Sequence, residues 1–338
     1  MSEFHVTIVQ LGSFEKHPNA DSLDITKVFD YTVVAKRGTW EPGQLAVYVP
    51  VDAVIPDTQE WSWLAPRDSN GELKFSTGST PEKYRVIEAK KIRGIFSQGV
   101  LAPLPPGDWK VGDSVATAMG ITKYEPPTPM TTGGECEPAP TGWKFVTYTD
   151  IEGLRRYPSV LEEGEEVVIT EKIHGANARF VHDGERLWVG SHGQIKKFDT
   201  KSIWWQAAIA EDMQSKLAAF PMHIIFGEVY GQVQDLKYGV KTGVQFRAFD
   251  VFSLLDMRYL NHDDAQRIVT AAGLRWVPVL YRGPWSSDCH SMAEGNSTLA
   301  DNVREGFVVK PIIERYHPEV GRVILKRHGE GYLLRKKK

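Results

Sequence analysis

A lysine at the end of an apolar strand, with a glycine three residues later, is the feature that most constrains this chain. Residues 166–170 are Glu-Val-Val-Ile-Thr, and branched residues of this kind favour extended backbone. Glu171 follows, and then the hexapeptide Lys-Ile-His-Gly-Ala-Asn at 172–177. Gly175 permits a tight turn that a residue with a Cβ would hinder. The pattern therefore predicts a fold that holds Lys172 at the end of a strand.

Further segments downstream pair strand-like runs with charged residues. Residues 226–231 are Phe-Gly-Glu-Val-Tyr-Gly and follow an apolar run, so Glu228 is expected at a strand end. The other segments are Arg-Ala-Phe-Asp-Val-Phe at 247–252, Arg-Glu-Gly-Phe-Val-Val-Lys at 304–310 and Ile-Leu-Lys at 324–326. Each segment alone is a weak signal, but their order along the chain makes them specific together.

In this order the segments resemble the motifs of the RNA ligase 2-like family, whose members are ATP-dependent and seal RNA ends through lysyl-AMP. The resemblance covers about residues 143–330, including the lead-in Phe-Val-Thr-Tyr-Thr-Asp-Ile-Glu at 145–152. His174 stands where DNA ligases and capping enzymes carry a carboxylate, which favours an RNA ligase. The resemblance implies an α+β nucleotidyltransferase core, an ATP-grasp-like ligase fold of antiparallel sheets with flanking helices.

The resemblance also implies a role for each motif residue. Lys172 would attack the α-phosphate of ATP, and Lys310 and Lys326 would be catalytic cations that neutralise charge during phosphoryl transfer. Phe249 would stack on the adenine. The residues expected to bind the nucleotide are Glu171, Ile173, Asn177, Glu228, Phe249, Lys310 and Lys326.

A pair of carboxylates is expected to hold the metal. Mg²⁺ prefers oxygen ligands and keeps several waters, and the resemblance implies Glu228 and Glu305 as its ligands, with Mn²⁺ as a substitute. Glu228 is also expected at the ribose. Because the attacking amine must be neutral, burial and cations such as Lys310 and Lys326 are expected to lower the pKa of Lys172 from its free value of about 10.4.

Two positions depart from the family pattern. A second lysine usually lies two residues after the first in the last motif, but here Lys326 is followed by Arg and His. The family often has Ser-Arg where this chain has Ser-His at 191–192, with the arginine on the 5′-phosphate side. Whether His192 replaces that arginine, or whether Lys196 or Lys197 does, stays open.

Composition divides the chain at residues 126–142, which are rich in Pro and Gly. Proline fixes φ and removes a hydrogen-bond donor, so a linker is expected there, with domains at 1–125 and 143–338. Before the linker, short strands separated by turn sequences predict a small barrel. These strands are expected at 6–11, 25–29, 32–35, 45–49, 84–87 and 100–104. After the linker, helices are expected at 202–217 and 263–272.

The first domain resembles OB domains that bind tRNA. The resemblance is carried by His-Pro-Asn-Ala-Asp-Ser-Leu at 17–23 and by Lys-Lys-Ile-Arg-Gly at 90–94. An OB-like domain in front of the core resembles the Deinococcus and Naegleria branch of RNA ligases. This branch implies RNA repair by sealing 5′-phosphate/3′-hydroxyl nicks in duplex RNA or an RNA/DNA hybrid. The candidate phosphate contacts in this domain are Lys36, Arg37, Lys90, Lys91 and Arg93.

Charge and composition indicate how the protein contacts phosphates and where in the cell it is expected. Residues 1–140 hold 13 Lys and Arg against 18 Asp and Glu, and the remainder holds 27 against 25. Contacts with phosphates must therefore be local. No apolar run is long enough to span a membrane, the start of the chain is not a signal peptide, and two distant cysteines suit reduced thiols. We therefore expect a cytoplasmic, monomeric protein with no membrane partner.

Three other functions remain open. An ATP-dependent DNA ligase shares the chemistry, and so does a GTP-dependent capping-type nucleotidyltransferase, but both normally place the OB domain after the core. A non-enzymatic protein that binds tRNA or other RNA would explain residues 17–21 and leave the later motifs unexplained. The physiological RNA, the nature of the 5′-phosphate strand and the contact of the OB-like domain with nucleic acid also stay open.

Overall fold

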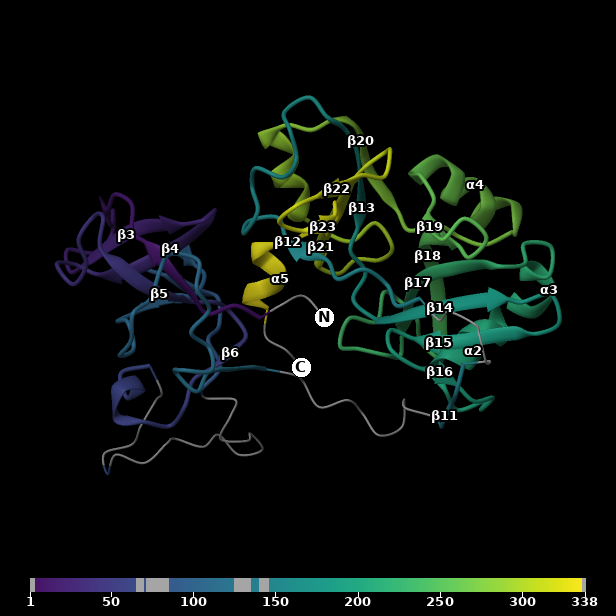
Figure 1. The fold of residues 1–338 in the computed structure, drawn as a ribbon, viewed down its shortest axis with the longest axis horizontal. Helices are drawn as coiled ribbons and strands as arrows, with labels where there is room; N and C mark the ends of the chain where they lie inside the picture. Colours follow the sequence, from purple (N-terminus) through teal and green to yellow (C-terminus); the bar gives the residue numbers. More distant parts are fainter. Residues whose placement is uncertain (1–3, 65–69, 71–84, 125–134, 140–145, 336–338) are drawn as a thin grey trace. The chain divides into compact units, whose positions relative to one another are not determined.

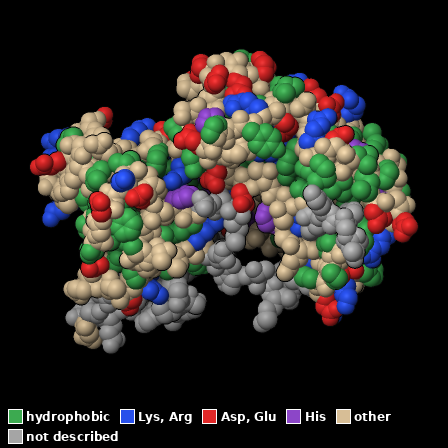
Figure 2. All heavy atoms as spheres, viewed as in Figure 1, with side chains coloured by type: hydrophobic (Ala, Val, Ile, Leu, Met, Phe, Trp, Pro, Cys, Tyr) green, Lys and Arg blue, Asp and Glu red, His purple; other side chains and the backbone are tan. Residues whose placement is uncertain are grey.

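The structure is a computed structural model that describes residues 4–64, 70, 85–124, 135–139 and 146–335. The chain forms two compact units, Met1–Pro127 and Thr128–Lys338 (Figure 1). On the face drawn in Figure 2, acidic and basic side chains are interspersed over the surface of each unit. None of the described helices is both long and apolar enough to cross a membrane.

The first unit is built from short β-strands. Its sheets have the orders β1-β5-β9 and β2-β3-β4, and β7-β8 and β6-β10 form two-stranded pairs. The backbone N–H of Gln98, which follows β8, donates a hydrogen bond to the carbonyl oxygen of Thr32 on β4. The elements are β1 (Thr7–Gln10), β2 (Glu15–Lys16), β3 (Leu23–Val28), β4 (Tyr31–Lys36), β5 (Leu45–Val49), β6 (Ala53–Val54), η1 (Gln59–Trp61), β7 (Lys90–Ile92), β8 (Ile95–Ser97), β9 (Val100–Ala102) and β10 (Thr122–Lys123).

Most of the expected barrel strands are present, with β5 at its predicted limits. The expected strand at 84–87 is wrong over its described part, because residues 85–87 contribute only an isolated bridge between Val86 and Val54. Tyr84 lies outside the described residues. The hairpin of β7 and β8 was missed, since its charged residues hide the strand alternation. Two apolar clusters, one around Ile8 and one around Tyr48, form the core of this unit.

The second unit contains a seven-stranded sheet of order β11-β16-β15-β14-β17-β18-β19. Phe180 and Val181 are neighbours on β14, and they lie in different apolar clusters because strand side chains alternate between faces. Helices cover the Phe180 face. The strands are β11 (Cys136–Glu137), β14 (Ala176–His182), β15 (Leu187–Ser191), β16 (Ile195–Lys196), β17 (His223–Gly231), β18 (Val244–Ser253) and β19 (Arg258–Tyr259).

A five-stranded sheet of order β12-β24-β21-β13-β20 is the second layer. All its pairs are antiparallel except β12 with β24. Its strands are β12 (Glu152–Gly153), β13 (Glu166–Glu171), β20 (Val279–Pro284), β21 (Gly306–Pro311) and β24 (Leu325–His328), and β22 (Tyr316–His317) pairs with β23 (Gly321–Arg322) beside it. Val308 and Ile324 join the apolar cluster on the Val181 face of the other sheet, so the two sheets pack against each other.

One of the two predicted helices is divided in the structure. The predicted helix at 202–217 is two helices, α2 (Ile203–Ala210) and α3 (Met213–Leu217). Asp212 separates them in a left-handed conformation with φ 51°, which a continuous helix does not allow. The other predicted helix is confirmed as α4 (His262–Ala271), with Gly273 after its end. The remaining helices are η3 (Ser287–Ala293) and α5 (Glu330–Leu334).

Candidate active site

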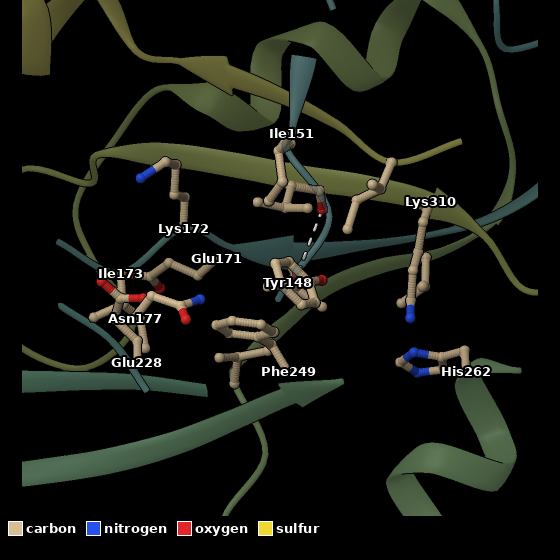
Figure 3. A pocket seen from close by; sticks show the side chains of 15 residues that line it. Tyr148, Ile151, Glu171, Lys172, Ile173, Asn177, Glu228, Phe249, His262 and Lys310 are labelled. Carbon is tan, nitrogen blue, oxygen red and sulfur yellow. Dashed lines mark hydrogen bonds between the residues drawn. The ribbon is translucent and has the colours of Figure 1, made fainter. Parts of the chain in front are cut away.

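A pocket of about 670 Å³, part of it open to solvent, lies between the two sheets of the second unit. Seven of the residues singled out in the sequence line it: Glu171, Lys172, Ile173, Asn177, Glu228, Phe249 and Lys310. In Figure 3, Lys172, Asn177 and Glu228 lie on one side of the pocket, and Lys310 and His262 face each other on the other side. Its mixed polar and apolar lining is typical of a small-molecule site.

Gly175 brings the Lys172 turn against β17. A Cβ added at Gly175 would lie 2.2 Å from the Val229 carbonyl oxygen and 3.0 Å from Cγ of Glu228. No other residue type allows this approach between the turn and the strand. Glycine at this position therefore serves close packing, which places Lys172 and Glu228 in one pocket.

Two carboxylates surround the amine of Lys172. Its Nζ atom lies 2.7 Å from Oε1 of Glu305. Burial lowers the pKa of Lys172, but the negative charges of Glu305 and Glu228 outweigh burial and raise it. The expected lowering by neighbouring cations is therefore wrong for the protein without nucleotide. Lys172 is held here as an ammonium group.

The two carboxyl groups differ in pKa. Burial raises the pKa of Glu228 to about 8, with Glu305 adding to the rise and Lys172 opposing it. Glu305 is also buried, but Lys172 and His328 outweigh that burial and hold the pKa of Glu305 well below its ordinary value. Glu228 is thus the more easily protonated of the two carboxyl groups.

The buried carboxylate of Glu171 accepts hydrogen bonds from Ser297 and Thr298. Its Oε1 accepts the hydroxyl of Ser297 at 2.5 Å, and its Oε2 accepts the hydroxyl and the backbone N–H of Thr298 at 2.6 and 2.9 Å. The side chain is 2% exposed. The strand end that precedes Lys172 is therefore fixed by a loop more than a hundred residues later in the chain.

Aromatic and orphaned polar groups line the middle of the pocket. The rings of Phe249 and Tyr148 are 4.9 Å apart and inclined at 59°, and Figure 3 shows them between Lys172 and Lys310. Oδ1 of Asn177 and Nδ1 of His262 are buried, and no hydrogen-bond partner for them exists among the described residues. Buried polar atoms are rarely left unpaired, so these atoms suit a polar ligand.

Lys310 belongs to a buried ionic network. Its Nζ lies 2.9 Å from Oδ1 of Asp250 and 3.3 Å from Oε1 of Glu314. Arg322 contacts both carboxylates at 2.6 Å, and the hydroxyl of Tyr148 donates to Asp250 at 2.8 Å. Lys310 thus lines the pocket while its charge is paired.

Glu305 lies outside the pocket lining, although it contacts Lys172, and so do four other residues considered in the sequence. Lys326 is on β24 opposite Val308. His192 is 4.0 Å from Asp150. Lys196 is buried and donates to Gln194 at 3.0 Å, and Lys197 forms an exposed ion pair with Glu135 at 2.8 Å.

His174 is the centre of a second polar cluster. Its Nε2 lies 2.7 Å from Oδ1 of Asp235, and its Nδ1 lies 3.2 Å from the hydroxyl of Tyr332. Burial lowers the pKa of His174, although Glu305 and Asp235 oppose this. A neutral ring that donates its Nε2–H to Asp235 accepts the Tyr332 hydroxyl at Nδ1.

Several residues of this site were missed in the sequence. Most of them lie in segments without a motif, and only the folded chain brings them to the pocket or to His174. They are Tyr148, Asp235, Asp250, His262, Ser297, Thr298, Arg322, His328, Tyr332 and Arg335. Tyr148 and Asp250 belong to the segments 145–152 and 247–252 that were singled out in the sequence. The position of Asp250 directly after Phe249 was the sequence feature that could have identified it.

The pocket and its surroundings offer few carboxylates that could bind a metal ion. Among the described residues, no three His, Cys, Asp or Glu side chains form a ready cation site. Mg²⁺ is usually bound through one or two carboxylates together with phosphates and waters. Glu305, buried beside the pocket with a lowered pKa, fits that mode, whereas the raised pKa of Glu228 makes it the weaker candidate of the two.

Two packed sheets around a pocket with a strand-end lysine define a nucleotidyltransferase-type core. Residues 165–328 match the family model described as RNA ligase, and residues 5–104 match one described as an OB-fold domain. The chain thus has a segment similar to RNA ligases behind one similar to an OB-fold domain, and the sequence-based fold class is confirmed. No curated protein matches the chain.

Solved structures of Naegleria gruberi RNA ligase share this fold. An arginine-to-alanine variant with ATP and Mn has a TM-score of 0.82 and 23% identity, and covers 98% of both chains. The same ligase with PPi has a TM-score of 0.81 and 23% identity over 98% of both chains. A further variant of it, with AMP and Mn, gives a TM-score of 0.81 at 22% identity over 98% of both chains.

Proposed function

We propose that this protein is an ATP-dependent RNA ligase that seals 5′-phosphate/3′-hydroxyl nicks through a lysyl-AMP intermediate. The observation that carries the proposal is the geometry of Lys172. Its amine is fixed at a strand end and lines the pocket between the two sheets, 2.7 Å from a buried carboxylate. A lysine buried in a pocket is suited to nucleophilic catalysis once it has lost its proton.

In the first step, Lys172 attacks the α-phosphorus of ATP. A bond from Nζ to phosphorus forms, the bond from that phosphorus to the bridging oxygen breaks, and pyrophosphate leaves. The ammonium group of Lys172, paired with Oε1 of Glu305, gives up one proton to solvent before the attack and a second after the bond to phosphorus has formed. The product is lysyl-AMP.

Other residues of the pocket bind different parts of the nucleotide. Phe249 stacks on the adenine, with Glu171 and Ile173 beside the base. Glu228 holds the ribose hydroxyls, for which a protonated carboxyl can donate as well as accept. Asn177, with an unpaired buried Oδ1 and an amide donor, contacts the reactive phosphate.

Lys310 and Lys326 supply positive charge to the phosphates. Lys310 is already in the lining, and nucleotide phosphates would compete for it with Asp250. Glu305 and Glu228 would hold Mg²⁺, or Mn²⁺ in its place. When bound, the metal neutralises the phosphate charge.

In the second step the AMP moves to the 5′-phosphate of the nick, and in the third step the 3′-hydroxyl attacks and releases AMP. The substrate is nicked duplex RNA or an RNA/DNA hybrid with an RNA 3′-hydroxyl strand, since a 2′-hydroxyl lets a protein distinguish RNA from DNA. The protein acts in the cytoplasm as a monomer, in RNA repair.

The OB-like domain, residues 1–125, grips the duplex and is joined to the ligase domain, residues 143–338, by the linker 126–142. Its β7–β8 hairpin exposes Lys90, Lys91 and Arg93. This hairpin is held in place, because Nε2 of His17 lies 3.1 Å from the Ile92 carbonyl and Asn19 donates to the Arg93 carbonyl at 3.0 Å. A fixed cluster of cations suits phosphate contacts.

Labelling with radioactive nucleotide tests the proposal. Purified protein is incubated with Mg²⁺ and either α-labelled ATP or α-labelled GTP and is then separated under denaturing conditions. We expect a label from ATP alone, none in Lys172→Ala, and sealing of a nicked RNA duplex by the wild-type protein. Label from GTP alone would instead identify a capping-type transferase. No label in folded, unadenylylated protein would favour an RNA-binding role.

A further inference from the structure

Helix α5 packs directly on the turn that carries the nucleophile. Tyr332, in this helix, is 9% exposed, and its hydroxyl lies 3.2 Å from Nδ1 of His174. Its ring is stacked on that of His328, with centroids 5.8 Å apart and an interplanar angle of 15°. His328 in turn lies 3.5 Å from Oε1 of Glu305, the oxygen that contacts Lys172. A single side chain thus reaches both histidines beside the nucleophile.

Arg335 fixes the opposite side of the same imidazole. Its Nη2 donates to both carboxylate oxygens of Asp235, at 3.2 and 3.1 Å. Asp235 uses one of those oxygens to hold Nε2 of His174 at 2.7 Å. The guanidinium also lies over the Tyr332 ring, 3.6 Å from its centroid. Both ring nitrogens of His174 are therefore oriented by groups that depend on α5.

The start of α5 is anchored as well. The backbone N–H groups of Glu330 and Gly331 donate to the two carboxylate oxygens of Glu294, at 2.8 and 3.4 Å. Just before the helix, Gly329 donates to the backbone carbonyl of Glu305 at 3.0 Å. These bonds fix the helix relative to the strand that follows Glu305. The helix also directs polar groups at His174, two residues from the nucleophile.

We infer that α5 and the residue after it form a positioning element of the ligase centre: Tyr332 in the helix and Arg335 at its end fix His174, and thereby the turn that presents Lys172 to the nucleotide. This inference deepens the proposed function and rests on it. His174 is two residues from Lys172, and its backbone N–H is held by the Tyr238 hydroxyl at 2.7 Å. With the ring fixed on both nitrogens, the turn has one orientation. The first step needs this orientation, since only that step uses the Lys172 amine as nucleophile.

The test compares two reactions in the full-length protein. Lysyl-AMP formation is measured in single turnover over a range of ATP concentrations, and sealing is measured with a nick whose 5′ end is already adenylylated. The variants are Tyr332→Phe, Arg335→Ala and the conservative Arg335→Lys. Matched controls lose similar bonds elsewhere: Tyr281→Phe loses a hydroxyl bond to Pro284, and Arg275→Ala loses an ion pair with Glu211.

We expect Tyr332→Phe and Arg335→Ala to slow lysyl-AMP formation at saturating ATP by about tenfold, with little change in the ATP concentration for half-maximal rate. Arg335→Lys should recover part of the rate. Sealing of the pre-adenylylated nick and the thermal midpoint should stay near wild type, and both controls should behave as wild type.

Wild-type lysyl-AMP rates in Tyr332→Phe and Arg335→Ala would overturn the inference and leave the proposed function intact. Equal losses in both reactions, together with a lowered thermal midpoint, would overturn it in favour of a purely structural role. A wild-type protein that forms no lysyl-AMP would overturn the proposed function first, and the inference with it.

Discussion

Lys172 and Glu305 form a close ion pair: Nζ and Oε1 are 2.7 Å apart, and the side chain of Glu305 is only 5% exposed. The two residues are brought together by neighbouring strands, since Glu171 at the end of β13 lies opposite Phe307 on β21. The pair makes the amine a worse nucleophile in the protein without nucleotide, because a protonated lysine has no lone pair. The amine must therefore lose its proton before it can attack.

The ion pair predicts how the amine responds to a small acylating reagent. Burial lowers the pKa of Lys172, but Glu305 and Glu228 raise it further, so the net pKa is raised. Without nucleotide, acetylation of Lys172 by acetic anhydride should therefore still be rising at pH 10, by roughly tenfold per pH unit below its pKa. Glu305→Gln removes the stronger of the two carboxylates and should increase labelling at pH 8 several-fold.

Peptide mass spectrometry measures this labelling, with Glu319→Gln as the control, because Glu319 is an exposed acid near His317. Equal or reduced labelling in Glu305→Gln would show that Glu305 does not control the charge of the amine.

Gly175→Ala should damage the site through packing alone. The new Cβ would lie 2.2 Å from the backbone oxygen of Val229, which cannot rotate away. We expect a loss of about 1–3 kcal/mol in the free energy of unfolding and a large loss of lysyl-AMP formation, because the turn must move away from β17. Urea unfolding and ATP labelling measure the two effects.

Gly193→Ala is the matched control for this substitution. No atom lies within 4 Å of a Cβ at Gly193, and its φ is not in the left-handed region. Similar behaviour of the two variants would contradict the packing argument.

The sequence predicted much of this site because motif residues carry their chemistry locally. A branched strand followed by Lys172 and a glycine turn specifies where the amine is presented, and the pocket does contain that residue with Glu228 and Phe249. Charge state was not predictable in this way. The expected cationic neighbour, Lys310, is paired with Asp250, and the partners that decide the charge of Lys172 are acids whose distance from it depends on the sheet register.

The residues that hold Glu171 and His174 in place could not be predicted from the sequence either. Ser297, Thr298 and Tyr332 lie in segments without strand or helix periodicity of their own, so nothing local marks them. Their contacts with Glu171 and His174 span more than a hundred residues. The break between α2 and α3 was missed for a related reason, since the left-handed backbone at Asp212 interrupts an apolar pattern that continues across it.

Asp250 should be essential for stability. Its carboxylate is fully buried and is the shared partner of Lys310 and Arg322, whose side chains are 6% and 2% exposed. Asp250→Asn would leave two buried cations with one fewer counterion, at a cost of about 3–5 kcal/mol in the free energy of unfolding. Asp263→Asn, which breaks an exposed pair with Arg282, should cost about 0–1 kcal/mol.

The same network gives a pH dependence with a definite sign. Burial raises the pKa of Asp250, but Arg322 and Lys310 outweigh it and lower the net value. The stabilisation is therefore present above the unfolded pKa of about 3.9 and is lost as the pH falls through the lower folded value. Urea unfolding at several pH values measures this. Equal free energies for Asp250→Asn and Asp263→Asn would refute the role of the network.

Phe249→Leu should weaken ATP binding while keeping the apolar packing of β18. The ring of Phe249 lines the pocket beside Tyr148, and stacking of an aromatic ring on a base contributes about 1–3 kcal/mol. We expect the dissociation constant for ATP with Mg²⁺ to rise by about tenfold, measured by calorimetry on the Lys172→Ala background so that no reaction occurs. An unchanged dissociation constant in folded protein would mean that the base lies elsewhere.

The β7–β8 hairpin should control the grip on the nicked duplex without affecting chemistry on ATP. Replacing Lys90, Lys91 and Arg93 by alanine removes three exposed cations from a hairpin. Each lost phosphate contact reduces the slope of log affinity against log salt by about one. The triple variant should therefore bind a nicked RNA duplex more weakly and with a shallower salt dependence, and should still form lysyl-AMP at the wild-type rate.

Fluorescence anisotropy across a salt series measures this binding. Alanine at Lys110 and Lys123, two other exposed lysines of the first unit, gives the control for loss of general charge. Because residues 1–140 hold more acidic than basic side chains, diffuse attraction would respond about equally to either set of substitutions. An equal response would therefore place the duplex contact outside this hairpin, whereas a selective effect of the triple variant would assign it there.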